Sequence, residues 1–177
     1  MILDRLFKLI ISGEAYMRLK HEFEPIYNIN SKVLILGSFP SVKSREQSFY
    51  YGHPQNRFWQ LIAKICNEDT PTTTEQKKAL CLSHCIALWD VIQSCEIEGS
   101  SDTSIKNVQV NDLNIILDNC NIDQIFVNGS TAYKLFVKYQ QTKTGTTAVK
   151  LPSTSPANAA WSFERLYGEW NIIRKYI

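Results

Sequence analysis

Two segments of the sequence are unusually rich in side chains that could bind or activate a ligand. The first is GSFPSVKSREQSFYYGHPQNRFW (37–59), and the second is LPSTSPANAAW (151–161). The first supplies small residues, serine hydroxyls, aromatic rings and a histidine, while the second crowds three hydroxyl side chains between Pro152 and Pro156. Such hydroxyls and backbone amides can hold phosphate oxygens, and contacts of this kind position a protein on a nucleic acid without reading its sequence.

Several other chemistries have little support in the sequence. It contains neither GxGxxG nor a Walker pattern, which argues against a nucleotide cofactor, and it has no GxSxG nucleophile elbow. Five cysteines, none in a CxxC pair, indicate reduced and buried thiols. Cys81, His84 and Cys85 superficially suggest a metal site, but no second ligand pair follows, so we expect neither a metal nor a cofactor.

The elements that must position these segments alternate along the chain. A continuous apolar run at 33–37 predicts a strand buried on both faces, residues 86–92 predict another buried strand, and 124–129 and 147–152 predict a third and a fourth strand. Helices are predicted from Pro54, from a capping box of Thr72 and Glu75 through His84, from a cap at Asn111 through Leu117, over 130–139, and from Trp161; residues 38–52 are predicted to be a loop. This order predicts an α/β fold whose parallel sheet carries ligands at the carboxyl ends of its strands.

The length and charge of the chain limit its possible domain organisation, location and partners. The 177 residues predict a single domain, 1–177, in which residues 1–16 are an optional extension because Met17 is a second candidate start. The apolar run at the N-terminus is interrupted by Asp4, Arg5 and Lys8, so no membrane segment is predicted and a cytoplasmic location is expected. A net charge of +2 does not by itself indicate a nucleic-acid partner.

The strings GSFPS, FYYGHPQNRFW and LPSTSPANA resemble the uracil-DNA glycosylase superfamily, and among its branches most closely the hypoxanthine-DNA (DNA-deoxyinosine) glycosylases. The resemblance extends from about His21 to the C-terminus. It implies a three-layer α/β/α sandwich around a short, mainly four-stranded parallel sheet. It also implies a hydrolase that extrudes a deaminated nucleotide from DNA, removes its base without a metal and leaves an abasic site.

The resemblance assigns roles to individual residues. The related mismatch-uracil branch has an asparagine where this chain has Phe39, which argues against ordinary uracil excision. The important polar group is then Asn56, whose amide can hold a water or a base edge. Tyr51 corresponds to the aromatic residue that stacks on the flipped base.

Other residues have predicted binding roles. We expect Gly37, Ser38 and Phe39 to bind the base edge through backbone amides, and His53 either to donate to the leaving purine or to buttress its loop. Lys43, Arg45 and Lys150 add positive charge, and Asp102 is a weaker polar candidate. The remaining predicted DNA contacts are Ser41, Ser153, Ser155, Pro156, Ala157 and Asn158.

Three alternatives remain open from the sequence. The first is a mismatch-specific uracil or thymine glycosylase with the same fold, and the second is a DNA-binding module that has lost catalysis. The third is a nucleoside hydrolase, which would also cleave free deoxyinosine. No lysine occupies a motif position suited to a Schiff base, so we expect a monofunctional enzyme that does not cut the strand after base loss. We also expect the protein to be a monomer.

Overall fold

The computed structural model describes residues 17–97 and 105–177, so the candidate Asp102 and the extension 1–16 lie outside the described residues. The centre of the fold is a four-stranded parallel sheet in the order β3-β2-β6-β7. Its strands are β2 (Val33–Gly37), β3 (Ile86–Asp90), β6 (Gln124–Asn128) and β7 (Ala148–Leu151). The predicted parallel sheet is confirmed, and β2 has the bounds that its apolar run predicts.

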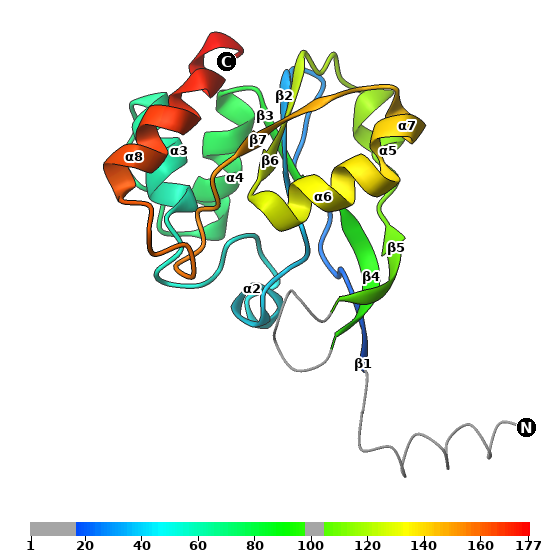
Figure 1. Cartoon of the computed structure of the whole chain (residues 1–177). Helices are drawn as coiled ribbons and strands as arrows, with labels where there is room; N and C mark the ends of the chain where they lie inside the picture. Colours follow the sequence, from blue (N-terminus) through cyan, green and yellow to red (C-terminus); the bar gives the residue numbers. More distant parts are fainter. Residues whose placement is uncertain (1–16, 98–104) are drawn as a thin grey trace, which may run out of the picture.

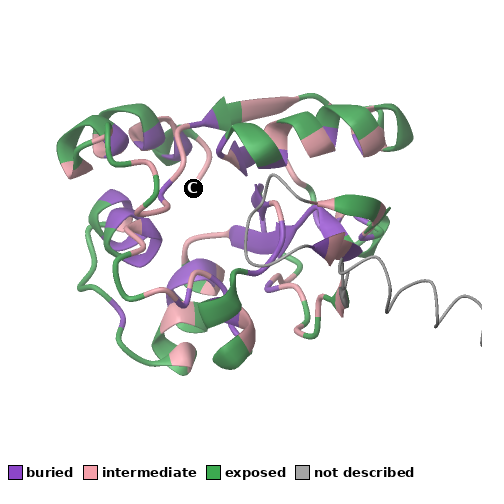
Figure 2. Ribbon diagram, turned by 60° about the horizontal axis from the view of Figure 1, so that its bottom comes forward, coloured by how far each residue is buried: buried purple, intermediate pink, exposed green. Residues whose placement is uncertain are grey.

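Helices cover both faces of this sheet, as the resemblance predicts. Figure 1 shows α3, α4 and α8 on one side, with α5, α6 and α7 on the other. Their bounds are α3 Phe58–Cys66, α4 Thr74–Ser83, α5 Asn114–Leu117, α6 Ser130–Tyr139, α7 Gln141–Thr144 and α8 Phe163–Trp170, followed by the 3₁₀ turn η2, Asn171–Lys175. Nearly all residues of β2, β3 and β6 are purple in Figure 2 because they are buried, whereas the edge strand β7 is mostly pink and green and the outer helix faces are green.

A second, antiparallel sheet was not predicted. It has the order β1-β4-β5, with β1 Met17–Lys20, β4 Ile92–Ile97 and β5 Lys106–Val110. The predicted strand over 86–92 is therefore wrong at its end, because the chain leaves the parallel sheet after Asp90 and Ile92 begins β4. Val91 and Ile92 are buried like the strand before them, so their apolar character gives no sign of the change.

Several predicted helix boundaries are also wrong. Residues 38–52 are not all loop, since α2 (Val42–Glu46) begins after its cap Ser41. The helix predicted from Pro54 starts at Phe58, and the last helix starts at Phe163 after the cap Ser162.

The remaining two corrections concern caps. The capping box is shifted by one residue to Thr73 and Gln76. Asn111 caps no helix; instead its Nδ2 donates to the backbone oxygens of Asp90 and Ile92, which fixes the point where β3 gives way to β4. Within the described part of the chain, no helix is long and apolar enough to cross a membrane.

Candidate active site

A cleft of about 720 Å³ opens at the carboxyl end of the parallel sheet. In Figure 1 this is the lower end, where β2 leads to α2 and β7 leads to the loop before α8. The cleft brings together ten of the predicted site residues, from two segments about a hundred positions apart: Gly37, Ser38, Phe39, Ser41, Tyr51, Asn56, Ser153, Ser155, Ala157 and Asn158. Its volume falls within the range of roughly 300–1,000 Å³ that is usual for ligand sites.

Asn56 lies in the turn that precedes α3. Its Oδ1 accepts a hydrogen bond from the backbone N–H of Phe58 over 3.0 Å, and this bond fixes the plane of the amide. The Asn56 side chain is half-buried and lines the cleft. An amide held in this way still offers the second lone pair of Oδ1 and the two N–H donors of Nδ2 to a ligand or a water.

Tyr51 is held in place by its backbone and by its neighbours. Its φ of 52° is in the left-handed region, which a bulky residue rarely adopts. One face of its ring stacks on Phe58, with 3.9 Å between the ring centroids, while the ring also lines the cleft. Burial raises the pKa of its hydroxyl well above the usual range, with a further contribution from Asp90, and the Asn128 side chain opposes the shift.

The loop of residues 152–161 is held by the arginine of the HPQNR turn. The Arg57 guanidinium donates to the carbonyl oxygens of Ser155 over 2.7 Å and Asn158 over 3.2 Å, and also to that of Trp161. Its Nε and its backbone N–H both donate to the carbonyl of Thr154. Arg57 therefore joins the two segments that the sequence singles out.

Within this loop the serine hydroxyls also organise the backbone. Ser153 Oγ accepts from the N–H of Ser155, and Ser155 Oγ accepts from the N–H of Ala157. Asn158 Nδ2 donates to the carbonyl of Ser153 over 2.9 Å. Since a hydroxyl that accepts a bond keeps its own hydrogen, both serines can still donate to a phosphate at the cleft.

Four described residues with a predicted binding role do not line the cleft: Lys43, Arg45, His53 and Pro156. Lys43 is exposed and pairs with Glu46 over 2.7 Å, and His53 Nδ1 accepts from the N–H of Gln55. Ser41 lines the cleft, but its hydroxyl already caps α2 by accepting from the N–H of Ser44. The backbone carbonyl of His53 also accepts a hydrogen bond within its own turn, from the N–H of Asn56.

Three polar residues near the cleft had no predicted role: His21, Asp90 and Asn128. Asp90 and Asn128 end β3 and β6 and line the cleft, and His21 Nε2 lies 2.8 Å from Asp90 Oδ2. The rule that ligands gather at the carboxyl ends of parallel strands would have found Asp90 and Asn128. His21 carried no sequence signal, because its partner is 69 positions away.

The cysteines are dispersed. Cys81 is buried in the core, while His84 pairs with Glu68 over 3.2 Å. In residues 17–97 and 105–177, no three His, Cys, Asp or Glu side chains gather as a metal ion would require.

The chain matches the family described as the Uracil DNA glycosylase superfamily over residues 24–173, which is most of its length, and it belongs to that superfamily. It is accordingly a DNA glycosylase, a hydrolase whose substrate is DNA.

Two curated relatives, both named "Hypoxanthine DNA glycosylase", come from Methanosarcina. The chain is 38% identical to the Methanosarcina barkeri protein over 112 residues, 62% of this chain and 71% of the relative. It is 32% identical to the Methanosarcina acetivorans protein over 162 residues, 89% of this chain and 99% of the relative. A solution NMR structure of a candidate uracil DNA glycosylase from Methanosarcina acetivorans has a TM-score of 0.77 at 31% identity, covering 90% of this chain and 98% of that one.

Proposed function

We propose that this protein hydrolyses the N-glycosidic bond of deoxyinosine in DNA, releasing hypoxanthine and leaving an abasic site. The observation that carries the proposal is the meeting of Asn56, Tyr51 and the serine loop around one cleft at the carboxyl end of the sheet. Two curated relatives named for hypoxanthine support this choice of base. Phe39 supports it as well, because the mismatch-uracil branch has an asparagine in its place.

The substrate must reach the cleft as an extruded nucleotide, since the target bond is inaccessible in a stacked duplex. Extrusion costs a few kcal/mol, and less for the weakly paired deoxyinosine. The Tyr51 ring face that Phe58 does not cover stacks on the extruded base. Stacking of this kind contributes about 1–3 kcal/mol per base.

Hydrolysis breaks the bond between C1′ and N9, whose electron pair leaves with the base, and water forms the new bond to C1′. Positive charge develops on the sugar and negative charge on the base, so oriented dipoles lower the barrier. Asn56 contributes such a dipole, because its amide is fixed by Phe58 and can hold the attacking water at Oδ1 or Nδ2. The water proton is finally taken up by the departing base.

DNA is held on the other side of the cleft by the loop of residues 152–161. Ser153 and Ser155 donate to the phosphates that flank the extruded nucleotide, and Pro156, Ala157 and Asn158 fill the gap that it leaves. Lys43 of α2 and the cap residue Ser41 contact the strand. Backbone amides of Gly37, Ser38 and Phe39 face the base edge, and His53 keeps the Asn56 turn in place.

Base release from oligonucleotides tests the proposal. The substrates are oligonucleotides that contain one deoxyinosine, one deoxyuridine or neither, and each is incubated with the protein in the presence of a chelator. The wild type is compared with Asn56→Ala. The control variant is Asn121→Ala, because Asn121 is exposed and lies outside the cleft. We expect the wild type and Asn121→Ala to release hypoxanthine, and the Asn56→Ala rate to fall by about 10²–10³-fold, as it does when one transition-state donor is removed.

Each other outcome selects a different function. Release of uracil alone would indicate a mismatch-uracil glycosylase, and cleavage of free deoxyinosine a nucleoside hydrolase. Binding of DNA without base release would indicate an inactive binding module, and strand cleavage after base release would contradict a monofunctional enzyme.

A further inference from the structure

A buried carboxyl group lies at the floor of the cleft. Asp90 ends β3, is 5% exposed and lines the cleft together with Gly37, the residue that ends the neighbouring β2. A Cβ atom added to Gly37 would lie 2.2 Å from Asp90 Oδ1. Only glycine at position 37 therefore leaves room for this carboxyl group at the cleft.

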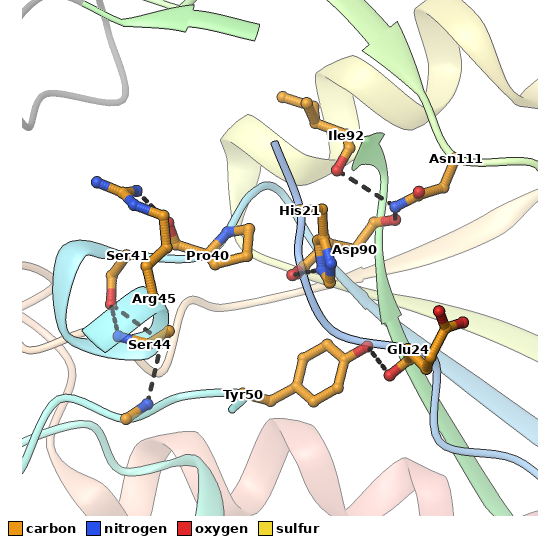
Figure 3. A network of polar contacts seen from close by, with 11 residues as sticks. His21, Glu24, Pro40, Ser41, Ser44, Arg45, Tyr50, Asp90, Ile92 and Asn111 are labelled. Atoms are coloured by element: carbon orange, nitrogen blue, oxygen red, sulfur yellow. Dashed lines mark hydrogen bonds and ion pairs between the residues drawn. The ribbon is translucent and has the colours of Figure 1, made fainter. Parts of the chain in front are cut away.

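The carboxyl group is held from behind by His21. Nε2 of His21 lies 2.8 Å from Asp90 Oδ2, and the His21 side chain is 2% exposed (Figure 3). The imidazole is surrounded by the rings of Phe23, Phe39 and Tyr50, with centroids 4.4, 6.4 and 5.9 Å away. His21 does not line the cleft, so Asp90 is the member of the pair that a ligand meets.

The backbone of Asp90 is fixed as well. The amide of Asn111 donates to the carbonyl oxygens of Asp90 and Ile92, as Figure 3 shows. A carboxylate that is removed from water is costly unless hydrogen-bond donors reach its oxygens. His21 supplies a donor for Oδ2, and a donor from the ligand would satisfy Oδ1.

We propose that Asp90, held by His21, accepts the N1–H of the extruded hypoxanthine and thereby discriminates against adenine; this inference rests on the proposed function. Hypoxanthine carries a hydrogen on N1, whereas N1 of adenine carries a lone pair that the carboxylate would repel. Because His21 occupies Oδ2, Oδ1 faces the base and accepts one N–H group from it. His21 is thus a positioning residue and Asp90 the residue that determines specificity.

The test compares two purines in single-turnover base release from DNA: deoxyinosine, and deoxynebularine, whose N1 is an acceptor. In Asp90→Asn the His21 donor holds the amide oxygen, so the NH₂ group faces the cleft and favours an N1 acceptor. We expect the ratio of deoxyinosine to deoxynebularine rates to fall by about 10- to 100-fold, as for the loss of one charge-assisted hydrogen bond. The control Asp123→Asn changes the same charge at an exposed residue outside the cleft and leaves the ratio unchanged.

The role of His21 is tested by the same ratio. His21→Phe keeps a ring among Phe23, Phe39 and Tyr50 but removes the donor, so the ratio of deoxyinosine to deoxynebularine rates should fall. His21→Gln keeps a donor, so its ratio should lie between those of His21→Phe and the wild type. A variant that is merely unstable would lower both rates alike.

The outcomes separate this inference from the proposed function. A wild type that releases no hypoxanthine refutes the proposed function, whereas hypoxanthine release with an unchanged ratio in Asp90→Asn refutes only the role of Asp90. Should Asp90→Asn fail to fold, the wild type is given 1-methyldeoxyinosine, in which a methyl group replaces the N1 hydrogen. Loss of release supports the contact, and release at the deoxyinosine rate overturns it.

Discussion

Asn128 and Thr154 form two hydrogen bonds with each other. The Asn128 Nδ2 donates to Thr154 Oγ1 over 2.9 Å, and the backbone N–H of Thr154 donates to Asn128 Oδ1 over 3.0 Å. Asn128 ends β6, and Thr154 is fully buried between the two serines of the loop after β7. The end of the sheet thereby sets the position of the loop whose hydroxyls we propose to hold DNA.

A double-mutant cycle measures this pairing. Asn128→Ala and Thr154→Val should each lower the free energy of unfolding by about 1–3 kcal/mol, because each leaves a buried polar group without its partner. The double variant should lose less than the sum of the two, by about 0.5–1.5 kcal/mol, since the Nδ2 to Oγ1 bond can be lost only once. Urea unfolding at pH 7 gives the four free energies.

The control for this cycle is Thr147→Val, an exposed threonine just before β7. Its effect should add to that of Asn128→Ala. If the effects of Asn128→Ala and Thr154→Val on the free energy of unfolding also add, the contact between Asn128 and Thr154 does not stabilise the loop.

Arg57→Lys tests the clamp on the same loop. A guanidinium reaches several carbonyl oxygens at once through its planar fork, whereas an ammonium is a single point of charge. We expect the free energy of unfolding to fall by about 1–3 kcal/mol and cleavage by a protease to become faster within residues 152–161. Limited proteolysis with mass spectrometry locates the cuts.

Arg174→Lys provides the matched change, because Arg174 is exposed on η2 and does not line the cleft. Its digestion pattern should equal that of the wild type. If Arg57→Lys also resembles the wild type, the guanidinium bonds do not hold the loop in solution.

Much of this fold follows from local patterns. Parallel strands buried on both faces are continuous apolar runs, as in β2 and most of β3 and β6, so the parallel sheet and the end of it that bears the site could be predicted. The order of the strands in the sheet was not predicted, and β7 is only partly buried. Asn56 and Tyr51 were predicted because their motif resembles that of the superfamily. Both line the cleft together with the serine loop.

The parts that could not be predicted depend on contacts between distant residues. The pairing of β1 with β4 joins Arg18 to Glu96, and the bond from His21 to Asp90 spans 69 positions. No periodicity in either segment encodes its partner. α3 starts at Phe58, four residues after Pro54, with Arg57 as its N-cap residue, and the N–H of Phe58 donates to the side chain of Asn56.

Alkaline pH should destabilise the folded protein. Burial raises the pKa of Cys66 from 9.0 to about 11, with Glu68 adding to the shift, and burial raises the pKa values of Tyr50 and Tyr51 above their usual range. The unfolded chain releases these protons at lower pH than the folded chain, so stability is complete below about pH 9 and falls as the pH rises further. Urea unfolding at pH 8, 9, 10 and 11 measures the slope.

Tyr51→Phe isolates one of these groups. The Tyr51 hydroxyl is buried without a well-formed hydrogen bond among the described residues, so its removal should not lower stability at pH 7. It should also reduce the loss of stability between pH 10 and 11, because one titrating group is gone. A slope identical to that of the wild type would show that the hydroxyl ionises equally in both states.

The salt dependence of DNA binding should distinguish lysines at the cleft from other lysines. Lys150 is exposed and lines the cleft, whereas Lys138 is an exposed residue of α6 that does not. If the ammonium of Lys150 contacts one phosphate, Lys150→Ala reduces the slope of log K against log salt by about 0.9 for duplex DNA, while Lys138→Ala leaves it unchanged. Lys43→Ala should have a smaller effect than Lys150→Ala, because Glu46 already pairs with its ammonium. Fluorescence anisotropy with a duplex that carries a stable abasic-site analogue gives the slopes, and equal slopes for Lys150→Ala and the wild type would place the DNA elsewhere.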